Sequence, residues 1–297
     1  MSRVVKCVSL VAIAALALTA CNSDLVAEEP GSEGGRQSSA ASLPASLAKT
    51  KTIRVLTDPT YPPLESIDAS GKMVGSDIDL MDAIAQQMGV KVEWQRGSFS
   101  GIIPGLQAGR FDASIAGMYI TDDKFKTVNM VQYAKAYDQM LVAKDYAGPE
   151  LNSYDALCGK RVTIPQGSTE IPLLEDASKK CAAGGQAPIA IQQFESANNA
   201  LLAVTSKRAD AAVVTNLNAD YVVGKLKADL KVHGRLPGVF PMGITLPKGQ
   251  DDLAEAVSTA LQELKTSGEY DKIMDKWKLG GSAVDAFPVN PKTTPAV

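Results

Sequence analysis

The four cysteines are the residues whose type and position most directly suggest covalent chemistry: Cys7, Cys21, Cys158 and Cys181. Cys7 and Cys21 fall in the first segment of the chain, which leaves Cys158 and Cys181 as a pair in its body. A metal site is the competing interpretation, but the single histidine, His233, leaves too few soft ligands for zinc. In an exported chain, which the N-terminus indicates below, the pair is predicted to form a disulfide.

Residues 166–170 (QGSTE) have the composition of a ligand-binding turn. They lie between an expected strand and the expected start of a helix, where unpaired backbone NH groups and the helix dipole favour an anion. Ordinary helix capping by Ser168 or Thr169 is the alternative. The two interpretations are compatible, because a capping residue can also face a cleft.

Catalysis has little support in the sequence. With His233 alone, the chain has no Ser-His-Asp set and no His-rich metal site. Acid-base catalysis would therefore depend on carboxylates, and the sequence does not show which of them would pair. We therefore expect no enzyme activity, no cofactor and no metal.

The N-terminus has the features of an export signal. Arg3 and Lys6 precede an apolar run, residues 8–18, that is too short to span a bilayer. The run ends in Leu-Thr-Ala-Cys, which resembles the lipobox of bacterial lipoproteins and makes Cys21 the predicted lipid site. A plain secretory signal with an incidental cysteine is the alternative. The following residues, to about 48, are rich in Ser, Gly, Ala, Glu and Pro and are predicted to be a disordered tether.

The charge of the chain argues against nucleic-acid binding. Residues 1–20 hold two cations and no acid, so their removal changes the formal net charge from −3 to −5. The mature chain is therefore mildly acidic and has no run of Lys and Arg to neutralise phosphates.

From residue 52 to residue 284, short β-branched runs alternate with longer helical stretches, a pattern typical of α/β layers around mostly parallel sheets. A first group comprises strands at 52–56, 90–94 and 111–116 with helices at 76–88 and 101–108. A second group comprises strands at 161–164, 189–191 and 210–214 with helices at 169–179, 197–206 and 218–226. A strand at 240–245 and helices at 253–265 and 270–277 close the chain.

Seven short motifs occur in the order and spacing of the extracellular solute-binding protein family 3, whose members serve polar amino-acid ABC importers, and the chain resembles that family over nearly its whole ordered region. One departure is Ser76, where an aromatic residue is usual. The motifs are residues 58–65 (DPTYPPLE), 75–80 (GSDIDL), 99–106 (FSGIIPGL), 109–113 (GRFDA), 118–121 (MYIT), 159–162 (GKRV) and 208–212 (RADAA).

The resemblance implies the α/β, two-lobe periplasmic-binding-protein-like fold (type II), with two hinge strands and the ligand in the interlobe cleft. We place the hinge crossings near residues 135–137 and 235–238. The implied organisation is a lipoprotein signal peptide at 1–20, a tether at 21–48, lobe one at 49–136 and 237–286, lobe two at 137–236, and a flexible tail at 287–297.

Three aromatic residues, Tyr61, Phe99 and Tyr119, fall on cleft positions of the family. Together they form a predicted aromatic box, which attracts a cationic or delocalised ligand through the ring quadrupoles. Packing within the lobe is the alternative role for each ring. Asp58 is a further predicted contact, at the edge of the cleft.

Other family positions depart from the usual pattern. Lys124 stands where an arginine holds the ligand carboxylate, and a lysine lacks the two-pronged grip of that guanidinium. Lys124 either neutralises an anionic group or is a solvated surface lysine. Gly117 replaces a frequent serine, and Thr215 replaces the aspartate that usually binds the α-ammonium group. The remaining predicted ligand contacts are Gln166, Ser168, Thr169 and Asn216.

The resemblance predicts a lipid-anchored, extracytoplasmic and monomeric substrate-binding protein that delivers a small polar solute to ABC permease subunits. The solute is an amino acid or a derivative; the aromatic box with Asp58 and Lys124 also looks like ectoine-binding members of the family. The alternatives are an exported enzyme of the same fold, similar to cyclohexadienyl dehydratase, and a receptor domain. The receptor has less support, because no second membrane segment or signalling module follows in the sequence.

Overall fold

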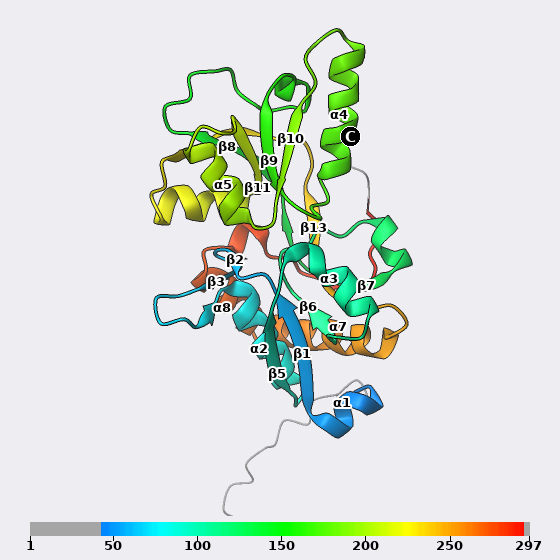
Figure 1. The fold of residues 1–297 in the computed structure, drawn as a ribbon. Coiled ribbons are helices and arrows are strands. Elements are labelled where there is room, and N and C mark those ends of the chain that lie inside the picture. Colours follow the sequence, from blue (N-terminus) through cyan, green and yellow to red (C-terminus); the bar gives the residue numbers. More distant parts are fainter. Residues whose placement is uncertain (1–42, 294–297) are drawn as a thin grey trace, which may run out of the picture. The chain divides into compact units, whose positions relative to one another are not determined.

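The computed structural model describes residues 43–293, which form two lobes, each built on a five-stranded sheet (Figure 1). The sheet of lobe one has the order β5-β1-β6-β13-β7, and that of lobe two has the order β10-β9-β11-β8-β12. Each sheet has a buried apolar core on both faces. The predicted α/β two-lobe class is confirmed.

In lobe one, β1 (Thr52–Thr57) lies between β5 (Lys91–Arg96) and β6 (Ala113–Ser114) and runs parallel to both. The long strands β7 (Val128–Ala136) and β13 (Phe240–Pro247) complete the sheet. Helices cover it, and a small sheet lies beside it. These elements are α1 (Ala45–Thr50), α2 (Ser76–Gln87), α3 (Ile102–Gln107), α7 (Asp251–Thr266), α8 (Glu269–Lys276), the 3-10 helices η1 (Phe99–Gly101), η2 (Asp122–Lys126) and η5 (Gly280–Ser282), and the small-sheet strands β2 (Thr60–Tyr61), β3 (Glu65–Ile67) and β4 (Met73–Val74).

Helix α2 illustrates how the sequence sets an element. Ile78, Met81 and Ile84 recur at helical spacing and are buried, and Met81 and Ile84 belong to the lobe-one core. Gly75 precedes the helix with φ 152°, and a Cβ there would lie 1.8 Å from the Leu64 carbonyl oxygen. Only glycine fits at this start.

In lobe two, β9 (Arg161–Pro165) runs parallel to β10 (Ala190–Phe194) and β11 (Ala211–Thr215), and β8 (Asp138–Ala143) runs antiparallel to both of its neighbours, β11 and β12 (Leu230–Arg235). The helices of this lobe are α4 (Ile171–Ala183), α5 (Ala197–Thr205), α6 (Asn216–Asp220), the short 3-10 helix η3 (Asp155–Leu157) and the π-helix η4 (Tyr221–Lys225), which continues α6.

The chain crosses between the lobes at two places. β7 ends at Ala136 and β8 begins at Asp138, so the first crossing is centred on Tyr137. The second runs from the end of β12 to Phe240 at the start of β13. The guanidinium carbon of Arg235 lies 3.9 Å from the centre of the Tyr137 ring, so a cation–π contact joins the two crossings.

The expectation of mostly parallel sheets holds for β5, β1 and β6 and for β10, β9 and β11, but both sheets are mixed, because β13 and β8 each run antiparallel to both of their neighbours. The strands that leave and re-enter each lobe are β7 and β13 in one sheet and β8 and β12 in the other. Each of these pairs is antiparallel, since the chain goes out and returns through the same hinge.

Two segments expected to lack structure are helical or paired. Residues 45–48, the expected end of the tether, belong to α1, because Leu47 is buried in the lobe-one core. Residues 287–293, the expected tail, lie against lobe one: Phe287 is buried, and Asn290 exchanges hydrogen bonds of 2.8 Å with the backbone of Met130.

The predicted disulfide between Cys158 and Cys181 is confirmed, and it links the segment before β9 to the C-terminal end of α4. Among residues 43–293, no helix is long and apolar enough to cross a membrane. The predicted signal peptide, the lipid site Cys21 and most of the tether lie outside the described residues.

Candidate functional site

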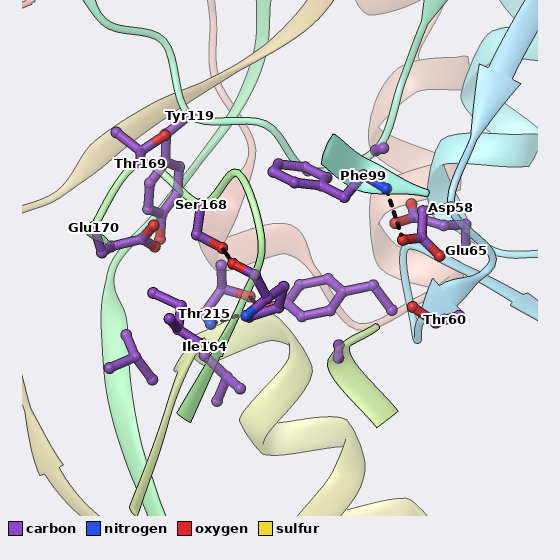
Figure 2. A pocket seen from close by; sticks show the side chains of 17 residues that line it. Asp58, Thr60, Glu65, Phe99, Tyr119, Ile164, Ser168, Thr169, Glu170 and Thr215 are labelled. Carbon is purple, nitrogen blue, oxygen red and sulfur yellow. Dashed lines mark hydrogen bonds between the residues drawn. The ribbon is translucent and has the colours of Figure 1, made fainter. Parts of the chain in front are cut away.

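A pocket of about 570 Å³, part of it open to solvent, lies between the two lobes (Figure 2). Loops that follow β1 and β6 in lobe one and β9 and β11 in lobe two contribute its walls, as expected for the carboxyl ends of strands in α/β sheets. The residues that line it are Asp58, Thr60, Tyr61, Glu65, Phe99, Ala116, Gly117, Tyr119, Ile164, Pro165, Ser168, Thr169, Glu170, Ala197, Val213, Val214 and Thr215.

Tyr61 and Phe99 face the pocket from lobe one. The Tyr61 hydroxyl group crosses to lobe two, where it donates to Thr215 Oγ1 over 3.2 Å and accepts from the Thr215 backbone NH over 2.8 Å. The Phe99 backbone NH donates to Asp58 Oδ2 over 3.0 Å, which fixes that carboxylate beside the ring (Figure 2). Burial raises the pKa of Asp58.

The Tyr119 ring lines the pocket and also packs against another aromatic side chain. Its ring stacks on Phe240 with centroids 4.9 Å apart, and only 3% of the residue is exposed. Its hydroxyl group donates to Asp138 Oδ1 over 2.9 Å. Tyr119 therefore ties the pocket to both hinge crossings, because Asp138 begins β8 and Phe240 begins β13.

Lys124 does not line the pocket, although it lies close to it. Its Nζ donates to the carbonyl oxygen of Tyr119 over 2.7 Å and to Thr169 Oγ1 over 2.6 Å, so it bridges the lobes. Burial lowers the pKa of Lys124 to about 8. The ammonium group is thus occupied by protein oxygens rather than directed at the pocket.

Two other predicted contacts also lie away from the pocket lining. Gln166 is exposed. Asn216 contacts the first hinge crossing instead, because its Oδ1 accepts a hydrogen bond from the Tyr137 backbone NH over 3.0 Å. In the turn between β9 and α4, Ser168 Oγ donates to the Pro165 carbonyl oxygen over 2.8 Å.

Two pocket residues, Glu65 and Glu170, were not identified from the sequence. Glu65 is fully buried and neither of its carboxyl oxygens has a hydrogen-bond partner among the described residues; burial and the neighbouring Asp77 raise its pKa well above the ordinary range. Glu170 precedes α4, and burial raises its pKa, an effect reduced by a hydrogen bond from its own backbone NH. Both stand inside motifs quoted above, but no local pattern distinguishes a pocket carboxylate from a surface one.

The residues that line the pocket determine which ligand charge it favours. Among the described residues that line it, Asp58, Glu65 and Glu170 carry carboxyl groups, and none is a lysine, arginine or histidine. Aromatic faces stand beside these groups (Figure 2). Such a lining favours a cationic, and particularly a delocalised, ligand group over an anionic one.

The comparisons with known proteins agree with this architecture. The model of the bacterial extracellular solute-binding proteins, family 3, matches residues 53–280. The lysine/arginine/ornithine-binding periplasmic protein of Escherichia coli is 32% identical over 252 residues, covering 81% of this chain and 92% of its own. The arginine-binding protein ArgT of Corynebacterium glutamicum is 28% identical over 251 residues, covering 84% and 82%.

Among solved structures, an ancestral arginine-binding protein bound to arginine matches with a TM-score of 0.70 and 38% identity, over 76% of this chain and 98% of that one. Fold and pocket together define a two-lobed solute-binding protein. The chain belongs to the bacterial extracellular solute-binding proteins of family 3, as its motifs predicted. The relatives are named for binding, in agreement with the expectation of a binding protein rather than an enzyme.

Proposed function

We propose that this protein is the substrate-binding component of an ABC importer and that its ligand is an amino acid with a cationic side chain, arginine first among the candidates. The observation that carries the proposal is the lining of the pocket, which combines three carboxyl groups with aromatic rings and contains no basic side chain among the described residues. An acidic amino acid would meet carboxyl groups there and, among the described residues that line it, no basic partner for its side chain.

The relatives support the same class of ligand. The names of the matching proteins specify arginine in Corynebacterium glutamicum and lysine, arginine and ornithine in Escherichia coli. A guanidinium group suits the pocket because it is planar and delocalised, so it can stack on Tyr61 or Phe99 while its NH groups reach a carboxylate.

Closure of the lobes supplies the binding mechanism. Among the described residues, side-chain hydrogen bonds that connect the lobes run from Tyr61 to Thr215, from Asn218 Nδ2 to the Pro62 carbonyl oxygen over 2.7 Å, from Lys124 to Thr169, and from Tyr119 to Asp138. A ligand that touches both walls adds to these contacts only in the closed arrangement, so it shifts the population towards closure.

Ectoine is the second candidate, and Tyr119 favours it. This third ring in the pocket could enclose a compact cyclic cation from another side. The delocalised amidinium group of ectoine suits the same carboxyl-rich lining.

Calorimetry with arginine, lysine, histidine, ectoine, glutamine and glutamate tests the proposal. We expect micromolar or tighter binding of one of the first four, with an affinity at least tenfold higher than for glutamate. Preferential binding of glutamate or glutamine would overturn the cationic assignment. Turnover of a cyclohexadienyl substrate would overturn the transport role.

We also propose that Cys21 carries lipid and anchors the protein outside the cytoplasmic membrane. The support is the Leu-Thr-Ala-Cys sequence after the apolar run, together with a family model whose description is extracellular. Cys21→Ser should move the protein from the membrane fraction to the soluble fraction. Unchanged fractionation without lipid on Cys21 by mass spectrometry would reject the anchor.

A further inference from the structure

A second carboxyl group lies behind Glu170, at the hinge end of the cleft. It belongs to Asp138, the first residue of β8, which is fully buried. Its Oδ1 accepts the hydrogen bond from Tyr119, but its Oδ2 has no partner among the described residues. A buried carboxylate oxygen without a donor is costly, so its retention calls for an explanation.

Asp138 and Glu170 act on one another. Burial raises the pKa of both groups, and the pKa of Asp138 is raised further by the negative charge of Glu170. The other polar groups facing the pair are the hydroxyls of Tyr61, Tyr119 and Tyr154, and the ammonium group of Lys124. Figure 2 shows the carboxyl end of Glu170 beside the hydroxyl end of Tyr119.

Lys124 does not neutralise the pair by direct contact. Its hydrogen bonds go to the Tyr119 carbonyl oxygen and to Thr169 Oγ1, and its attraction to Glu170 acts through space. With no cation among the described residues in direct contact, two carboxylates in so buried a place do not both stay charged, so the pair holds a proton when no cationic ligand is bound.

We propose that a cationic group of the ligand binds at Glu170 and Asp138 and takes the place of the proton that these two carboxyl groups share. This inference rests on the proposed function, and it adds the position of the cation and the stoichiometry of the exchange. Glu170 lines the pocket and makes the direct contact. Asp138 lies behind it and supplies the second negative charge.

Proton exchange gives the binding a characteristic pH dependence. Below the pH at which the pair ionises, a cation must displace a proton, so the apparent affinity for a permanent cation rises with pH by up to tenfold per unit for one proton. Above that pH, the affinity is constant. Release of the proton also appears in calorimetry as a heat that depends on the ionisation enthalpy of the buffer.

The test uses L-arginine with wild type, Glu170→Gln, Asp138→Asn and the matched control Glu175→Gln, whose exposed side chain lies on α4, the helix that Glu170 precedes. We expect at least tenfold weaker binding for Glu170→Gln, weaker binding with a flatter pH profile for Asp138→Asn, and no change for Glu175→Gln. The Asn variant keeps an oxygen for the Tyr119 hydroxyl group, and thermal unfolding verifies that each variant folds.

The outcomes separate the two proposals. If wild type binds arginine but Glu170→Gln binds equally well, or if no proton is released between pH 5 and 8, the cation lies elsewhere and this inference is wrong while the proposed function stands. If wild type binds none of arginine, lysine, histidine and ectoine, both are wrong.

Discussion

The Tyr61 hydroxyl group in lobe one accepts a hydrogen bond of 2.8 Å from the backbone NH of Thr215 in lobe two. The ring of the same residue lines the pocket. One side chain therefore contacts the ligand space and joins the lobes. Thr215 stands where the family usually has an ammonium-binding aspartate, so its contact with Tyr61 gives that position a role in closure.

Tyr61→Phe separates these two roles. The variant keeps the ring but loses both hydrogen bonds to Thr215, so we expect arginine to bind roughly two- to thirtyfold more weakly, consistent with about 0.5 to 2 kcal/mol for the two bonds. Small-angle scattering should show a larger radius of gyration without ligand. Tyr221→Phe, on η4, is the control. An unchanged affinity would show that closure does not depend on this contact.

Lys124 should give the folded protein a pH-dependent stability. Its pKa of about 8 in the folded state is below its ordinary value of 10.5, so the unfolded chain binds more protons between these limits. The free energy of unfolding should therefore rise as the pH increases from about 8 towards 10.5.

Urea unfolding of wild type and Lys124→Met at several pH values measures this effect. The contribution should be absent from Lys124→Met and present in Lys91→Met, whose lysine is exposed. Equal slopes in wild type and Lys124→Met would assign the pH dependence to other groups. The Met variant should also bind ligand more weakly, because the bridge to Thr169 is lost.

Asp77 gives a prediction of the opposite sign. Burial raises its pKa to about 6, while Tyr133 Oη donates to its Oδ2 over 2.8 Å. The folded state then binds more protons than the unfolded chain between about pH 4 and 6, and the contribution of Asp77 to stability is lost as the pH rises through 6.

Asp77→Asn removes this titration. The amide oxygen still accepts from Tyr133, and the amide NH2 can donate to Glu65, whose oxygens have no partner among the described residues. We expect the variant to be more stable than wild type at pH 7, by roughly 1 to 3 kcal/mol, in urea unfolding. Asp229→Asn, at an exposed position, is the control. A less stable Asp77→Asn protein would contradict the assignment.

The disulfide should contribute stability without contributing affinity. Cys158 and Cys181 are separated by 23 positions, and closing a loop of that size is worth roughly 3 kcal/mol in the chain-entropy model. Cys181 lies near the C-terminal end of α4, whereas Glu170 precedes its first turn, roughly 16 Å away along the helix.

The double variant Cys158→Ala, Cys181→Ala should therefore unfold at lower urea concentration but bind arginine with unchanged affinity. Wild type treated with a reducing agent should behave like the variant. A large loss of affinity in a folded variant would show that α4 transmits strain from the disulfide to the site.

The fold was predictable where the signal is local. The period of the helices, the glycine at 75 and the order of the motifs identify two α/β lobes, and eight of the predicted contacts do line the pocket. The mixed sheets were not predictable from local patterns, because β7 and β13 pair over more than a hundred residues of sequence.

The acidic character of the site was hidden for a similar reason. Asp138 follows the first hinge crossing, after β7. Glu170 follows the turn after β9, and Glu65 follows a loop between β2 and β3 in lobe one. Asp138 and Glu170 lie on different elements of lobe two, so their charges interact only after that lobe has folded, and no spacing along the chain indicates the pair. The sequence shows that Lys124 departs from the arginine usual at this family position. Its bridge to Thr169 could not be predicted, because Thr169 belongs to the other lobe.

The two hinge crossings make lobe two a single continuous insertion between β7 and β13. Its points of entry and exit face one another, since Ala136 pairs with Phe240 in one antiparallel ladder. Insertions with neighbouring ends disturb the host domain little. Lobe two of a relative could thus replace lobe two of this protein at these two junctions. The hybrid would keep the aromatic pocket residues of lobe one and place the relative's lobe-two pocket residues opposite them.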